Sequence, residues 1–139
     1  MVNLGFPELY ASNNKNSLFH RMSLIQELAS QTGVLAAGEY AYRGDRFSYV
    51  GHLEEEQARM ASIMCRATTM AVHMQVDMMK SLGTDCGCAP ARGWVVKGTQ
   101  FSVCVIGNVF CFLDNRATTI NQVMQFMLQK VADQTGELI

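Results

Sequence analysis

The strongest hydrophobic pattern in the chain is a long periodic run from about Leu53 to Leu82. Three glutamates, Glu54 to Glu56, occupy its first turn, where carboxylates complement the positive end of a helix. When the run is projected onto a helix, its polar positions form one narrow stripe: Arg59, Ser62, Arg66, Thr69, His73, Asp77 and Lys80. We predict a helix of roughly eight turns in which this stripe is a solvated face.

The apolar arc of this helix covers about two-thirds of its circumference, whereas a helix on one sheet needs a stripe of only about 100°. One side of the arc holds Met60, Ile63, Met64, Ala67, Met70, Ala71, Met74 and Met78, and the other holds Ala61, Cys65, Val72, Val76 and Met79. We therefore expect two partners, the chain's own sheet and the same helix of a second copy. The predicted dimer contacts are Ala61, Cys65, Val72, Met74, Val76 and Met79, with Trp94 and Val96 from a later strand.

Shorter patterned segments flank the long helix. Helical spacing predicts a first helix from Ser17 that ends at Gly33, and a last helix from Ile120 to Val131 that is capped by Thr118 or Thr119. Apolar segments bounded by turn residues predict strands at 34–42, 47–50, 94–96, 101–106 and 109–113. Residues 1–16 show no sustained period, so we expect an N-terminal arm there and a single domain over residues 17–139.

This order of elements predicts an α+β domain with three layers, in which a five-stranded antiparallel sheet carries the long helix on one face and two helices on the other. The arrangement resembles the Roadblock/LC7 fold. The segment from Gly33 to Glu39 looks like that family's opening helix-to-strand junction. The segments 93–96 and 101–109 resemble an uncharacterised prokaryotic branch of the family, and the likeness covers residues 17 to 132.

The resemblance implies a homodimer in which the long helices lie side by side and the two sheets join at their edges. It also implies a scaffold or regulator, because many relatives dock onto small GTPases or motor complexes. Members of this branch look like those encoded beside heterodisulfide-reductase-like sulfur-oxidation proteins. The chain has no phosphate-loop motif and is therefore not itself the GTPase. We expect a non-enzymatic adaptor or regulatory subunit that docks on a larger complex in sulfur metabolism.

Charge and composition narrow the classes of partner. The net charge is −1 and the charged residues are scattered, which gives no basic surface for nucleic acid or an anionic membrane. No apolar run approaches the length of about 20 residues that a membrane helix requires. The cysteines, five in number, follow no disulfide framework, which favours a reducing compartment and hence the cytoplasm.

Candidate chemistry is confined to Cys86 and Cys88, two thiols in a glycine-bearing loop. They offer an alternative function, a small sulfur-handling or redox protein, although a closed metal site usually needs four ligands. We interpret Cys65, Cys104 and Cys111 as small core hydrophobes. We find no catalytic triad and expect no metal or cofactor. Two further alternatives are a ligand-sensing module with a pocket between helix and sheet, and an adaptable docking surface formed by the helix methionines.

Overall fold

The computed structural model describes residues 24–83, 87 and 89–132. The elements along the chain are a helical segment at residues 24–29, then β1 Val34–Tyr40, β2 Phe47–Gly51, α3 Glu55–Ser81, β3 Gly93–Lys97, β4 Phe101–Ile106, β5 Val109–Asp114 and α4 Ile120–Ala132. The strands form one sheet in the order β2-β1-β5-β4-β3, and every neighbouring pair is antiparallel. The predicted architecture is therefore confirmed. The N-terminal arm, Cys86 and Cys88 lie outside the described residues.

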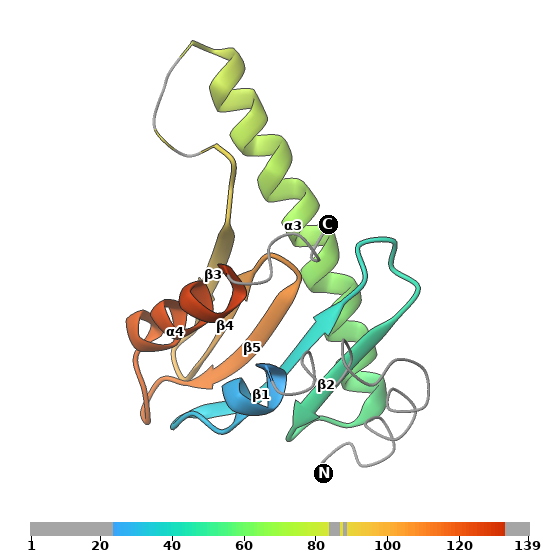
Figure 1. Ribbon diagram of the computed structural model, residues 1–139, viewed down its shortest axis with the longest axis vertical. Coiled ribbons are helices and arrows are strands. Elements are labelled where there is room, and N and C mark those ends of the chain that lie inside the picture. The colour runs from blue at the N-terminus through green and yellow to red at the C-terminus, as the bar shows by residue number, and fades with distance from the viewer. Residues whose placement is uncertain (1–23, 84–86, 88, 133–139) are drawn as a thin grey trace.

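The sheet is the middle of three layers, with α4 and the helical segment 24–29 on one face and α3 on the other (Figure 1). On the α4 side, side chains such as Ile25, Leu28, Leu113 and Met127 form a closed apolar core. On the α3 side, a smaller buried cluster contains Tyr40, Cys65, Val105 and Phe110. Among the described residues, no helix is long and apolar enough to cross a lipid bilayer.

Local interactions explain where several elements begin and end. The Gln57 side chain accepts a hydrogen bond of 3.0 Å from the backbone N–H of Glu54, which caps the start of α3. Of the two caps predicted for α4, Thr119 provides the cap, because its hydroxyl accepts a hydrogen bond of 3.2 Å from the N–H of Gln122. The first strand ends at Tyr40, earlier than expected, because the chain turns after Ala41.

The orientation of α3 on the sheet corrects one prediction. The buried positions of this helix are Ala58, Ser62, Cys65 and Thr69. The expectation of a solvated polar stripe is therefore wrong for Ser62 and Thr69, each of which is 5% exposed. The four buried side chains are all small, so the helix backbone can lie close to the sheet. The Thr69 hydroxyl accepts a hydrogen bond from Tyr40 on the sheet, whereas the Ser62 hydroxyl donates one to the backbone oxygen of Arg59 in the same helix.

The C-terminal half of α3 extends past the sheet, as Figure 1 shows. From Met70 to Gly83 the structure describes every residue, and none of them is buried. Since a helix rises about 1.5 Å per residue, roughly half of its length projects from the domain. The longest helix of the chain is thus also the helix with the least cover in the protomer.

Candidate interaction surface

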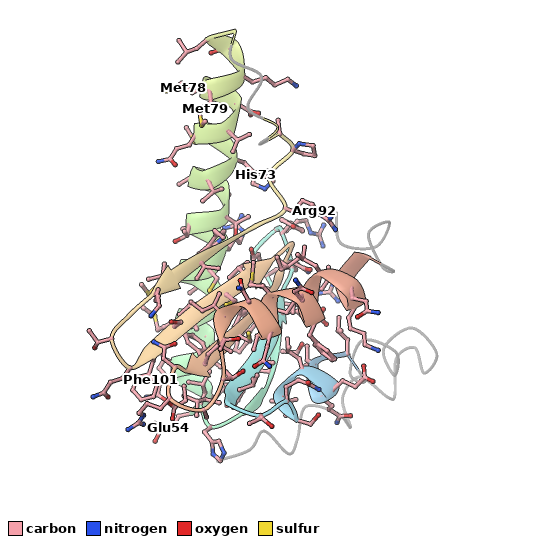
Figure 2. All side chains as sticks on the ribbon, turned by 90° about the vertical axis from the view of Figure 1, so that its left-hand side faces the viewer. Glu54, His73, Met78, Met79, Arg92 and Phe101 are labelled. Atoms are coloured by element: carbon pink, nitrogen blue, oxygen red, sulfur yellow. The ribbon has the colours of Figure 1, made fainter. Side chains whose placement is uncertain are left out.

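The outer face of α3, defined as Met60, Ile63, Met64, Met70, Met74 and Met78, points away from the sheet. Helical geometry places these positions opposite the buried residues Ala58, Ser62, Cys65 and Thr69. Their side chains are 44% to 71% exposed. Figure 2 shows Met78 on the projecting end of the helix, clear of the strands. The protomer therefore presents a long apolar surface that its own sheet does not cover.

A second surface, the β3-side flank of α3, contains Ala61, Thr68, Val72, Gln75 and Met79. Its side is fixed by a contact on the opposite flank. There Arg66 donates a hydrogen bond of 2.6 Å to the backbone oxygen of Tyr42, between β1 and β2. The flank carries no charge. Ala61, Thr68 and Val72 are half-buried.

The strand next to this flank is an edge of the sheet. β3 pairs with β4 on one side and with no described strand on the other. Val96 is 56% exposed, and Trp94 is half-buried with its indole N–H donating a hydrogen bond of 2.8 Å to the Thr69 hydroxyl. An open strand edge is a template for pairing with another strand. The β3 edge and the adjacent flank of α3 together form one surface, on which the charged side chain is that of Lys97 at the end of β3.

The structure divides the predicted dimer residues among different environments. Ala61, Val72 and Met79 lie on the β3-side flank, and Val76 is half-buried where the helix extends past the sheet. Met74 lies on the outer face and is 71% exposed. Cys65 is 4% exposed and packs within the protomer's own cluster, so it is not available to a second chain. The predicted dimer residues of α3 are therefore spread over the β3-side flank, the outer face and the core of the protomer.

Thr69 joins the helix to the sheet through a hydrogen-bond network that sequence reasoning missed. Its hydroxyl oxygen accepts a hydrogen bond of 2.9 Å from Tyr40 and one of 2.8 Å from Trp94. Burial raises the pKa of Tyr40 to about 12, so this phenol remains a neutral donor. A signal was present in the sequence, because Ala58, Ser62, Cys65 and Thr69 place a small side chain on every turn of one helix face.

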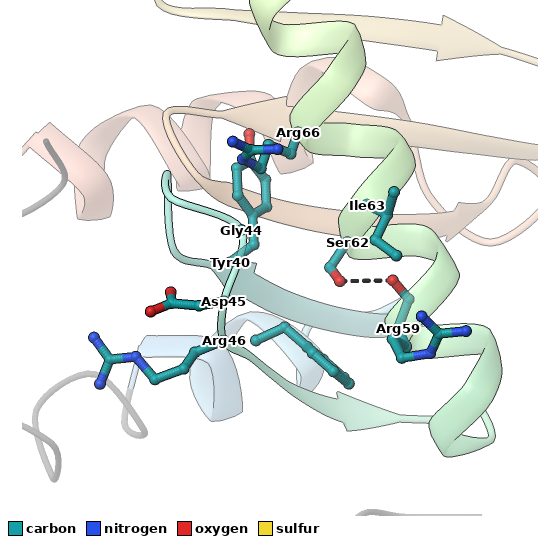
Figure 3. Close-up of a pocket in the computed structure, with 9 residues that line it drawn as sticks. Tyr40, Gly44, Asp45, Arg46, Arg59, Ser62, Ile63 and Arg66 are labelled. Atoms are coloured by element: carbon teal, nitrogen blue, oxygen red, sulfur yellow. Dashed lines mark hydrogen bonds between the residues drawn. The ribbon is translucent and has the colours of Figure 1, made fainter.

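The ligand-sensing alternative predicts a pocket between helix and sheet, and a shallow groove lies between α3 and the turn after β1 (Figure 3). It measures about 190 Å³ and is lined by Tyr40, Gly44, Asp45, Arg46, Phe47, Arg59, Ser62, Ile63 and Arg66. Glu56 pairs with Arg59, Arg43 pairs with Asp45, and Figure 3 shows Asp45 and Arg46 pointing away from the helix. The charged groups do not converge on one point, and ligand sensing stays a prediction.

Within the described part of the chain, no three histidine, cysteine or acidic side chains are grouped closely enough to hold a metal ion. Cys104 and Cys111 are buried in the core under α4 as free thiols. A hydrogen bond with Cys111 lowers the pKa of the Cys104 thiol, and the same interaction, with burial, raises the pKa of Cys111. The redox hypothesis for Cys86 and Cys88 concerns residues outside the description and also stays a prediction.

Comparison with known proteins agrees with this architecture. The structure is similar to that of Myxococcus xanthus MglB, with a TM-score of 0.66 and 10% sequence identity over 91% of this chain and 95% of that chain. At this identity the likeness concerns the fold, which is the Roadblock/LC7 fold. None of the curated proteins matches the sequence. A family model described as "Uncharacterized conserved protein (DUF2173)" matches residues 24–129, and the chain therefore belongs to this family.

Proposed function

We propose that the chain is a non-enzymatic adaptor or regulatory subunit that acts as a homodimer and docks on a larger protein assembly. The observation that carries this proposal is the outer face of α3, which exposes six large apolar side chains without an intervening charge. Monomeric soluble proteins rarely expose a continuous apolar surface of this kind unless it binds another molecule. The Roadblock/LC7 fold supports the same class of function by analogy.

The dimer contact that we propose is the β3-side flank of α3 together with the β3 edge. Small or uncharged side chains on the flank allow two helices to lie side by side, while two β3 strands can pair across a two-fold axis. Arg59, Arg66 and Asp77 lie on the other flank, where they would remain in solvent. This arrangement buries apolar surface without enclosing an unpaired charge.

The outer face then remains accessible on the dimer, and we assign the docking of the partner to it. Methionine side chains are flexible and polarizable, which suits a surface that adapts to a large partner. We therefore assign Met74 to the docking surface and not to the dimer contact. The partner class that we propose is a heterodisulfide-reductase-like complex in the cytoplasm. This choice rests on the resemblance of segments 93–96 and 101–109 to the branch encoded with such proteins.

A matched pair of substitutions separates the two surfaces. Val72→Glu places a charge on the flank, and Met74→Glu places the same charge two residues further along on the outer face. Native mass spectrometry should report monomers for V72E and dimers for M74E. When co-expressed with heterodisulfide-reductase-like subunits, the parent chain should co-purify with them and M74E should not. A dimeric V72E would refute the assignment of the flank, and undiminished co-purification of M74E would refute the docking surface.

A further inference from the structure

Three sulfur atoms meet in the core on the α4 side of the sheet. Cys104 on β4 and Cys111 on β5 are directly opposite each other in the antiparallel register. The Cys111 Sγ lies 3.6 Å from the Sδ of Met127 on α4. Cys104 and Cys111 are 0% exposed and Met127 is 1% exposed. We call these three residues the sulfur cluster.

The spacing within the sulfur cluster is close to that of ligands sharing one metal ion. Two sulfurs that each lie about 2.3 Å from a metal, at an angle of about 110° to 120°, are roughly 3.8–4.0 Å apart. The separation of 3.6 Å between Cys111 and Met127 needs only a small adjustment to reach this range. The antiparallel register places Cys104 directly opposite Cys111, and both side chains lie in the core on the α4 side, so the third sulfur belongs to the same group.

We propose that Cys104, Cys111 and Met127 form a binding site for one soft monovalent metal ion, of which Cu(I) is the physiological example. Soft sulfur donors select Cu(I), and a set of one thiolate, one thiol and one thioether suits its low coordination number. Structural zinc is almost always bound by four ligands. The buried side chains around the sulfur cluster, such as Ile25, Leu28 and Val123, supply no fourth donor.

A monovalent ion can be bound here without leaving a net charge. The buried neighbours are apolar, so a net charge in this core would lack partners and would be costly. When Cu(I) binds, one thiol releases its proton to solvent as the first copper–sulfur bond forms. The second thiol and the thioether of Met127 then coordinate through lone pairs. The Cu(I) ion thus replaces the released proton, so the net charge of the site is unchanged. Copper remains Cu(I), and no electron is transferred.

The test uses the full chain in a C86S/C88S background, which removes the loop thiols as competing ligands. The reduced protein is incubated anaerobically with Cu(I), buffered by the chelator bicinchoninate, and in parallel with Ag(I), a redox-stable ion of the same charge and softness. Native mass spectrometry should show one ion per chain and the loss of one hydrogen. The copper X-ray absorption spectrum should show sulfur alone in the first coordination shell.

Substitutions in the sulfur cluster should weaken this binding selectively. C104A/C111A should retain no ion. M127L, which nearly conserves volume, should weaken binding by roughly tenfold, a difference of about 1.4 kcal/mol. The matched controls are C65A, a buried cysteine on the other face of the sheet, and M124L, one turn earlier in α4, and both should bind as the parent does.

Either of two results would overturn the proposal. One is the absence of any retained ion in the C86S/C88S protein after prolonged incubation and also after refolding with the metal. The other is an M127L variant that is folded by circular dichroism and binds Ag(I) as tightly as the parent. This second result is decisive even if the double alanine variant fails to fold.

Discussion

The helices on the two faces of the sheet differ in the side chains that they turn toward it. α4 turns its large apolar side chains, Val123, Met127 and Val131, toward the sheet and into a closed core. α3 turns small side chains toward the sheet and its methionines toward solvent. The comparison shows that the apolar content of a helix does not by itself tell which face is buried within one chain. A surplus of apolar surface can instead be reserved for contacts between chains.

The largest expected effect compares a core residue under α4 with a residue on the outer face of α3. Leu113→Ala should lower the free energy of unfolding by about 2–5 kcal/mol, because it leaves a cavity at a fully buried site. Met74→Ala should change it by no more than about 0.5 kcal/mol in the protomer, because that side chain is exposed. Urea denaturation at low protein concentration measures both. Equal effects would mean that the outer face is already covered within one chain.

A smaller effect should follow from removing the hydroxyl that joins α3 to the sheet. Thr69→Val leaves the Tyr40 phenol and the Trp94 indole N–H without their acceptor and should cost about 1–3 kcal/mol. Thr68→Val is the control, since this neighbouring side chain is only half-buried and lies on the β3-side flank. Thermal or urea unfolding of both variants checks the prediction. A T69V protein as stable as T68V would show that the network contributes little to holding α3.

The pH dependence of stability should reveal the same network. The pKa of Tyr40 is raised from 10.0 to about 12, mainly by burial. Its contribution is therefore fully present below pH 10 and is lost as the pH rises through 12. The loss amounts to at most about 1.4 kcal/mol for each pH unit. Tyr40→Phe should show a shallower decline than the parent between pH 10 and 12, and identical slopes would contradict this role for Tyr40.

Much of the fold was predictable from the sequence because the local signals agreed with one another. The long helix was expected over 53–82 and is observed as Glu55–Ser81, since the glutamates mark its start clearly. Even the opposition of Cys104 and Cys111 follows from the two-residue turn at Gly107 and Asn108, which fixes the hairpin register. These features depend on neighbours in sequence, where pattern and turn chemistry are informative.

The orientation of α3 could not be predicted in the same way. The usual amphipathic rule directs the apolar arc inward, but here small residues at 58, 62, 65 and 69 allow close approach to the sheet. Periodicity alone cannot weigh close packing by small residues against burial of large ones. The proximity of Met127 to Cys111 was equally hidden, because it depends on how α4 is placed across the sheet. Both features depend on contacts between elements that are far apart in the sequence.

The molar mass of the native protein, followed by light scattering during dilution, tests most directly whether the β3-side flank of α3 and the β3 edge join two copies of the chain. The account predicts a species of twice the chain mass of 15.4 kDa, which dissociates only at high dilution. A soluble species of 15.4 kDa at every concentration would contradict it, because the β3-side flank would then have no second copy to meet.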